Sequence, residues 1–171
     1  MSWDDELIDE ITYESYDAAD KPFDFVEEGT ETVLVCESDP AIRSVAVGTL
    51  KDLGYHVSEA SSAKDALKSM RFHIYDVIVV NESYEGTNAD DNIILRYLNS
   101  LSMNVRRNIF VALISSRFRT MDNMAAFNRS VNMIVNQKNI DELDTVLKKG
   151  VAEYRFFYEV FTESSRKIGK V

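Results

Sequence analysis

The sequence predicts an α/β fold in which five parallel strands form a central sheet with helices on both faces. One observation is a set of short apolar runs without polar alternation, clearest in YDVIVVN at 75–81. Such β-branched runs are typical of strands that are buried on both faces of a parallel sheet. A second observation is that segments with helical spacing of apolar residues alternate with these runs. Parallel strands joined by helical crossovers form a doubly wound sheet.

The elements follow one another with clear start and stop signals. Pro40 suits the first turn of a helix that Ser38 or Asp39 caps, and Gly54 ends that helix. The expected strands lie at 33–36, 55–59, 75–80, 109–114 and 131–135. The expected helices lie at 40–53, 63–70, 93–101, 120–129 and from 139 onward.

Negative charge is concentrated in an N-terminal arm, residues 1–31. The chain has a net charge of −10, yet the arm alone holds twelve acidic residues against one base, and the rest is close to neutral. Direct binding to nucleic acid is not expected, because phosphate contacts need a basic surface. The composition of the arm is typical of a flexible, solvated tail. One alternative is a docking helix with Leu7, Ile8 and Ile11 on one face, which would bind a basic groove of a partner. Another is an arm that folds onto the basic C-terminal end.

Two features favour a reduced, cytoplasmic setting. Cys36 is the single cysteine, so an internal disulfide is impossible. The acidic N-terminus is unlike a secretory signal, and no apolar run approaches the roughly 18 residues of a membrane span, so membrane insertion is not expected. The two histidines have no spacing with Cys36 that would bind zinc, and no metal site is expected.

The final helix is expected to continue past the domain as an extension, residues 151–171. One helical stripe of this extension consists of large aromatic residues: Tyr154, Phe157, Tyr158 and Phe161. The stripe either packs back on its own domain or forms an exposed patch that binds a second copy or another protein, since aromatics dominate interface energetics. Gly150 is a candidate hinge before the extension.

Three segments and the spacing of the five strands carry a family resemblance. The segments are VLVCESDPAIR at 33–43, GYHVSEASSAKDAL at 54–67 and YDVIVVN at 75–81. In these features residues 32–150 resemble the receiver domain of bacterial two-component response regulators. The resemblance implies a flavodoxin-like sheet with strand order 2-1-3-4-5.

The same resemblance implies a phosphorylation site at the carboxyl ends of the strands, which this chain retains only in part. Receivers have two acidic residues after the first strand that bind Mg²⁺, and this chain has Glu37 and Ser38 there. The aspartate that accepts the phosphoryl group corresponds to Asn81, and the lysine after the fifth strand corresponds to Asn136. The Ser or Thr that senses the phosphoryl group corresponds to Ser115.

Asparagine at position 81 removes the nucleophile. An amide is neutral and its lone pair is delocalised, so it cannot form the acyl phosphate that a carboxylate forms. With Glu37 as the remaining carboxylate, Mg²⁺ binding is expected to be weak or absent, and no cofactor is expected. The chain is therefore interpreted as a pseudo-receiver without enzymatic activity. Its expected role is that of a stand-alone module that binds protein partners in bacterial signalling without phosphorylation.

Two other functions stay open at this point. The protein is an authentic phosphoacceptor if a displaced aspartate, Asp90 or Asp91, takes the phosphoryl group, although both acids also suit the start of the third helix. It is a small-ligand sensor if the less acidic pocket around Asn81 binds a metabolite. Ser115 is either a switch residue or a cap of the following turn.

Overall fold

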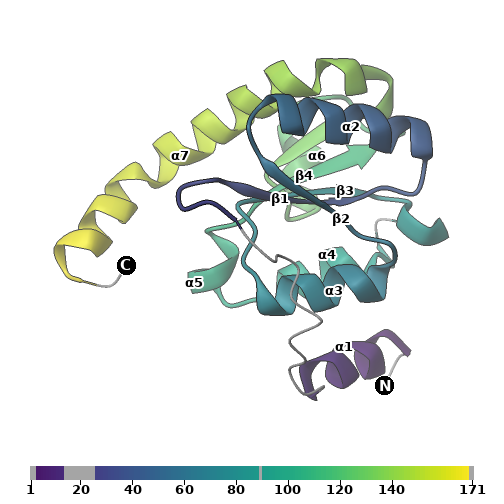
Figure 1. Cartoon of the computed structure of the whole chain (residues 1–171), viewed down its shortest axis with the longest axis horizontal. Coiled ribbons are helices and arrows are strands. Elements are labelled where there is room, and N and C mark those ends of the chain that lie inside the picture. The colour runs from purple at the N-terminus through teal and green to yellow at the C-terminus, as the bar shows by residue number, and fades with distance from the viewer. Residues whose placement is uncertain (1–2, 14–25, 89, 170–171) are drawn as a thin grey trace.

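The computed structural model of the chain describes residues 3–13, 26–88 and 90–169 (Figure 1). Five parallel strands form one sheet in the order β2-β1-β3-β4-β5. The strands are β1 (Thr32–Cys36), β2 (His56–Glu59), β3 (Val77–Asn81), β4 (Phe110–Ser115) and β5 (Met133–Asn136). The predicted α/β fold and its strand order are confirmed.

Helices precede, connect and follow the strands. The α-helices are α1 (Trp3–Tyr13), α2 (Pro40–Asp52), α3 (Ala63–Phe72), α4 (Ile93–Ser100), α5 (Met103–Arg106), α6 (Asn123–Asn128) and α7 (Leu143–Lys167). The described part of the chain also contains the 3₁₀ turns η2 (Tyr84–Gly86) and η3 (Gln137–Glu142). The short helix α5 had no signal in the apolar pattern and was not predicted.

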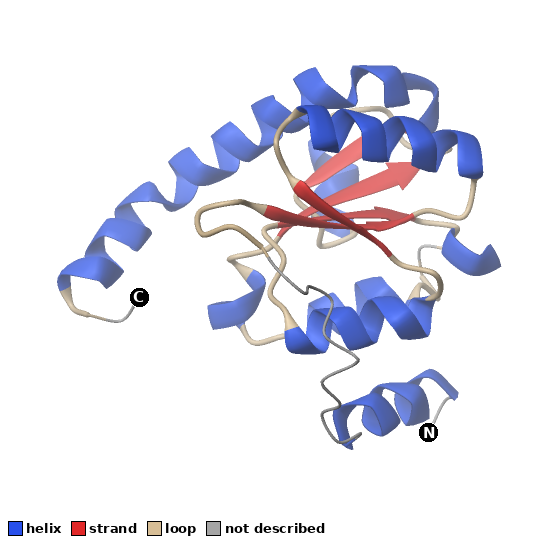
Figure 2. Cartoon of the chain, viewed as in Figure 1, coloured by secondary structure: helices blue, strands red, loops and turns tan. Residues whose placement is uncertain are grey.

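The sheet lies between two helical layers, and each layer shares a core with one face of the sheet. In Figure 2, α2 and α7 lie above the strands and α3 and α4 lie below them. Leu34, Ile78 and Leu113 pack with the inner faces of α3, α4 and α6. The alternate strand residues, such as Val35 and Val79, pack with α2 and α7. Every residue of β1, β3 and β4 is buried, which explains why these runs do not alternate with polar residues.

Polar side chains at the helix starts satisfy backbone N–H groups that have no partner within the helix. Asp39 caps α2 and accepts hydrogen bonds from the backbone N–H groups of Ala41 and Ile42, with Pro40 in the first turn. Asn92 caps α4, because its Oδ1 accepts hydrogen bonds from the backbone N–H groups of Ile94 and Leu95. The expectation that Asp90 or Asp91 caps this helix is therefore wrong.

Part of the acidic arm is a helix that packs on the domain. α1 lies beside α3 (Figure 1), where Leu7 and Ile8 contact the core cluster of the lower layer. Glu10 and Asp5 form ion pairs with Lys64 and Arg96, at 3.5 and 2.9 Å. The flexible tail is thus wrong for α1. The predicted helix forms, but it packs on its own domain, whereas the sequence suggested docking on a partner. Residues 14–25 and the side chain of Ile11 lie outside the described part of the chain.

The arm does not reach the C-terminal end through α1, because α1 and α7 lie on opposite sides of the sheet (Figure 1). At the end of the predicted arm, Glu31 forms an ion pair with Arg155 of α7. The predicted contact between the arm and the basic C-terminal end is therefore made by Glu31 and not by the helical part of the arm.

α7 is one continuous helix of 25 residues, so the predicted hinge at Gly150 is wrong. Gly150 is buried within this helix, and a Cβ at its position would lie 2.7 Å from Met133 Sδ and 3.0 Å from Phe110 Cζ. Glycine is therefore needed because α7 passes close to the sheet there. Beyond the sheet, α7 projects from the body (Figure 1). Among the helices that the structure describes, none is long and apolar enough to cross a bilayer.

Candidate functional site

The candidate site lies at the carboxyl ends of the strands, which meet at one edge because all five are parallel. Glu37 directly follows β1, and the last residues of β3, β4 and β5 are Asn81, Ser115 and Asn136. The structure divides these side chains between two hydrogen-bond networks and a loop contact.

The first network joins Asn81 to Glu37. The Asn81 Nδ2 amide donates to Glu37 Oε2 at 2.7 Å, and Asn81 Oδ1 accepts from the backbone N–H of Ser83 at 2.8 Å. Glu37 Oε1 accepts from the backbone N–H of Asp39 at 2.9 Å. Glu37 and Asn81 are both buried. An aspartate at position 81 would repel the carboxylate of Glu37, whereas the amide of Asn81 donates a charge-assisted hydrogen bond to it.

The second network centres on Glu82, a residue that the sequence reasoning placed in a loop and did not single out. Its side chain is only 3% exposed. Glu82 Oε1 accepts from Ser115 Oγ at 2.7 Å and from the backbone N–H of Ser116 at 3.3 Å. Glu82 Oε2 accepts from Arg117 Nη2 at 3.0 Å in an ion pair. The carboxylate thus ties the end of β3 to the loop that follows β4.

The pKa of Glu82 reflects this arrangement. Burial raises the pKa of the carboxyl group, but hydrogen bonds from Arg117, Ser115 and the Ser116 backbone outweigh burial and hold it below its ordinary value. Glu82 is therefore an anion at neutral pH. The available signal in the sequence was an acid directly after the third strand together with an arginine two residues after Ser115.

Ser115 has the cap role that the sequence left open. It is fully buried, and its Oγ accepts hydrogen bonds from the backbone N–H groups of Arg117 and Phe118 at 3.0 and 3.1 Å. The same hydroxyl donates its own hydrogen to Glu82. A buried hydroxyl with this set of partners is held in one orientation.

Asn136 is a structural residue in the position of the receiver lysine. Its Nδ2 donates to the backbone carbonyl of Phe118 at 2.8 Å, and its Oδ1 accepts from the backbone N–H of Lys138 at 3.0 Å, which caps η3. Lys138 is exposed. The cation beside Ser115 is instead Arg117, which the β4–α6 loop supplies.

The remaining candidate residues make separate contacts. Ser38 is exposed, and its Oγ accepts from the backbone N–H of Glu85 at 3.1 Å. Asp90 forms an ion pair with Arg129, and Asp91 accepts from Asn88 Nδ2 at 2.6 Å. These contacts keep the two aspartates in the β3–α4 loop and give no support to a displaced acceptor beside Glu37.

The donor set does not fit a magnesium ion. Mg²⁺ is bound by hard oxygen ligands, of which carboxylates carry the charge. Both oxygens of Glu37 accept hydrogen bonds from the protein, and both oxygens of Glu82 are engaged by Ser115, Ser116 and Arg117. Within the described residues no group of three or more His, Cys, Asp and Glu side chains is arranged to hold a metal.

The aromatic stripe of the C-terminal extension is divided between two environments. Tyr154 and Tyr158 lie toward the domain, since Tyr154 packs edge-on against Phe110 at 5.5 Å and against Tyr158 at 5.0 Å. Phe157 is 76% exposed, and Phe161 is partly covered by the guanidinium of Arg107, 4.0 Å from its ring centre. The stripe therefore packs on its own domain in one part and is exposed in the other, and binding by the exposed part stays a prediction. The exposed side also includes Phe156 and Val160, which were not in the predicted set.

The fold is that of solved response-regulator receiver domains. No protein-family model and no curated protein matches the chain. A response regulator from Thermotoga maritima is 19% identical, with a TM-score of 0.55 over 72% of this chain and 98% of that one. The chemotaxis response regulator CheY4 of Vibrio cholerae is 16% identical, with a TM-score of 0.51 over 70% and 98%.

A third similar structure is the receiver domain of the sensor histidine kinase PA1611 from Pseudomonas aeruginosa. It is 18% identical, with a TM-score of 0.57 over 72% of this chain and 99% of that one, and it has a magnesium ion coordinated in its active site cleft. At such identities the likeness establishes the fold, and the chemistry of the site has to be argued from the residues of this chain.

Proposed function

We propose that this chain is a cytoplasmic signalling module with a receiver fold that binds other proteins, is not phosphorylated and catalyses no reaction. The observation that carries the proposal is the hydrogen bond between Asn81 Nδ2 and Glu37 Oε2. An aspartate in this position would be an anionic nucleophile next to a metal-binding carboxylate. The amide is neither a nucleophile nor a metal-binding anion, and it occupies the oxygen of Glu37 that would otherwise face the site.

Glu82 supports the same proposal. In the receivers that the sequence resembles, the Ser or Thr after the fourth strand senses the phosphoryl group. Here the hydroxyl of Ser115 and the N–H of Ser116 are bound by the Glu82 carboxylate, an anion that belongs to the chain and is always present. The loop between β4 and α6 is therefore held in one arrangement, and no added phosphate is needed to set it.

The partner surface is proposed on α6. Phe127 and Met124 of this helix are 78% and 70% exposed. A large apolar side chain at a solvated surface marks a contact site when several occur together. α6 follows the loop that Glu82 and Ser115 hold in place, so a fixed loop would present these side chains in a fixed position. The assignment of this face follows receivers by analogy of fold.

The test is to incubate the protein with acetyl phosphate and Mg²⁺ and to measure the intact mass, with a phosphorylatable receiver in parallel as the positive control. We expect the control to gain one phosphoryl group and this protein to gain none. A stoichiometric, acid-labile phosphoryl adduct would contradict the proposal. Its loss in an Asp90→Asn or Asp91→Asn variant would then locate the acceptor in the β3–α4 loop.

A further inference from the structure

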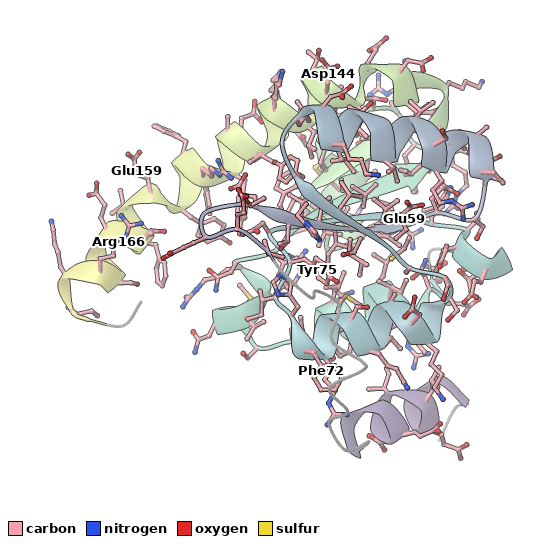
Figure 3. The ribbon with its side chains drawn as sticks, viewed as in Figure 1. Glu59, Phe72, Tyr75, Asp144, Glu159 and Arg166 are labelled. Atoms are coloured by element: carbon pink, nitrogen blue, oxygen red, sulfur yellow. The ribbon has the colours of Figure 1, made fainter. Side chains whose placement is uncertain are left out.

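The outward side of α7 has an apolar patch on the part of the helix that projects from the body (Figure 1). Phe156, Phe157 and Val160 are 78%, 76% and 75% exposed. In Figure 3 the labelled Glu159 and Arg166 mark this projecting segment. The opposite side of the helix is already occupied, since Tyr154 packs on Phe110 of the sheet. The outward patch is therefore left without a cover from the described part of its own domain.

Charged residues lie at equal distances from the centre of this patch. Glu153 lies seven residues before Val160 and Lys167 lies seven residues after it. Seven residues are close to two helical turns, so all three side chains lie on the same side of α7. Glu153 and Lys167 are exposed, and neither has an ion-pair partner among the residues that the structure describes.

One large and one small residue follow the same symmetry. Phe156 lies four residues before Val160, and Ser164 lies four residues after it. When the helix is turned end for end about Val160, Phe156 therefore meets a small residue and Glu153 meets a lysine. A surface that is complementary to itself after such a rotation is the requirement for a twofold, isologous contact.

We propose that α7 pairs with α7 of a second copy of this chain in an antiparallel arrangement, with Val160 on the twofold axis. Each Phe156 packs over Ser164 of the second copy, and each Glu153 forms an ion pair with Lys167 of the second copy. A parallel pair would place Glu153 against Glu153 and Lys167 against Lys167, and like charges opposite each other disfavour it. The charge pattern thus selects both the partner and its direction.

A second copy is favoured over an unrelated protein because the pattern is self-complementary. An unrelated partner would need only the apolar patch, and the flanking charges would have no reason to be opposite in sign at equal distances from it. The patch is also remote from the strand-end network of Glu37, Asn81 and Glu82, which lies at the other end of the strands. Pairing through α7 therefore leaves the strand-end network uncovered.

The first experiment measures the oligomeric state of the full chain by sedimentation velocity over a range of concentrations. We expect a reversible dimer in the wild type. Val160→Glu places two carboxylates at the axis and is expected to give a monomer at all concentrations. Phe127→Ser, which removes an equally exposed aromatic from α6, is the matched control and is expected to leave the dimer unchanged. Far-UV circular dichroism and thermal midpoints establish that each variant is folded.

The charge pairs are tested by a swap. Glu153→Lys and Lys167→Glu each create two like-charge contacts and are expected to weaken the dimer about tenfold, whereas the double variant restores both pairs and wild-type affinity.

The contact at the axis is tested by Val160→Cys under mild oxidation. We expect a disulfide-linked dimer in this variant and none in Phe127→Cys, because the native Cys36 is fully buried.

Three results would overturn the inference. One is a wild type that stays monomeric up to about 1 mM. Another is a dimer that persists in folded Val160→Glu, which would place the interface elsewhere. The last is a double charge variant that is no tighter than either single variant, because the antiparallel register requires the swap to restore both pairs.

Discussion

Asn81 and Glu82 are neighbours in the chain, yet their side chains belong to different networks. Side chains alternate in direction along a strand and at its end, so Asn81 reaches Glu37 after β1 while Glu82 reaches the loop after β4. Asn81 and Glu82, at the end of β3, thereby connect this strand to the ends of its two neighbours, β1 and β4. Because of this geometry and the neutral amide at position 81, the carboxylates of Glu37 and Glu82 are both hydrogen-bonded within the protein.

The Glu82 network should contribute measurably to stability. Glu82→Gln removes the charge that Ser115, Ser116 and Arg117 hydrogen-bond to, and we expect a loss of about 1–3 kcal/mol in the free energy of unfolding at pH 7. Urea denaturation measures it, with Glu28→Gln as the control, because Glu28 is exposed. An unchanged urea midpoint in Glu82→Gln would show that the carboxylate is not held as described.

The pH dependence of the same difference has a defined sign. The pKa of Glu82 in the folded protein lies below its ordinary value of 4.5 because of the hydrogen bonds from Arg117, Ser115 and Ser116, which outweigh burial. The stability it provides is therefore fully present above about pH 4.5 and is lost as the pH falls through the folded-state pKa. The gap between wild type and Glu82→Gln should narrow below pH 4.5 and should be constant from pH 6 to 8.

At the scale of single elements, α2 and α7 each contain a glycine, and the two glycines should respond to alanine in opposite ways. Nothing lies within 4 Å of a Cβ at Gly48 of α2, so Gly48→Ala should stabilise the protein by about 0.5–1 kcal/mol through helix propensity. At Gly150 of α7 a Cβ would press on Met133 and Phe110, and overpacking of this kind costs about 1–3 kcal/mol. Thermal unfolding of the two variants measures both changes. Stabilisation by Gly150→Ala would show that α7 can move away from the sheet without cost.

For the whole molecule, the sequence was sufficient for the sheet because the buried runs of β1, β3 and β4 have no other stable environment than the centre of a parallel sheet. Asn81 and Asn136 could also be identified from the sequence, because each is the last residue of a predicted strand or directly follows it. Glu82 was missed because its role depends on the loop after β4, which the strand pattern does not place. The exposure of Phe156 and Val160 was missed because it depends on how α7 is rotated against the sheet. The spacing of aromatic residues along the helix does not determine that rotation.

The place of α1 gives a prediction for the molecule as a whole. All strands and all buried residues of both core clusters lie within residues 32–151. Of the described residues before residue 26, Leu7 and Ile8 pack against the outside of the lower layer. A chain that begins at residue 26 should therefore fold cooperatively and keep the Glu31–Arg155 pair, while losing about 1–3 kcal/mol of stability with the cover that α1 provides.

The matched variant is Leu7→Ala with Ile8→Ala in the full chain. The two ion pairs of α1 are exposed and contribute little, so the double variant should lose nearly as much stability as the truncated chain, with little dependence on salt. Urea midpoints and hydrogen exchange along α3 measure both effects. If the double variant is as stable as the wild type while the truncation is not, α1 stabilises the domain through its charges and not through its apolar side. If neither change affects α3, then α1 is not packed on the domain in solution.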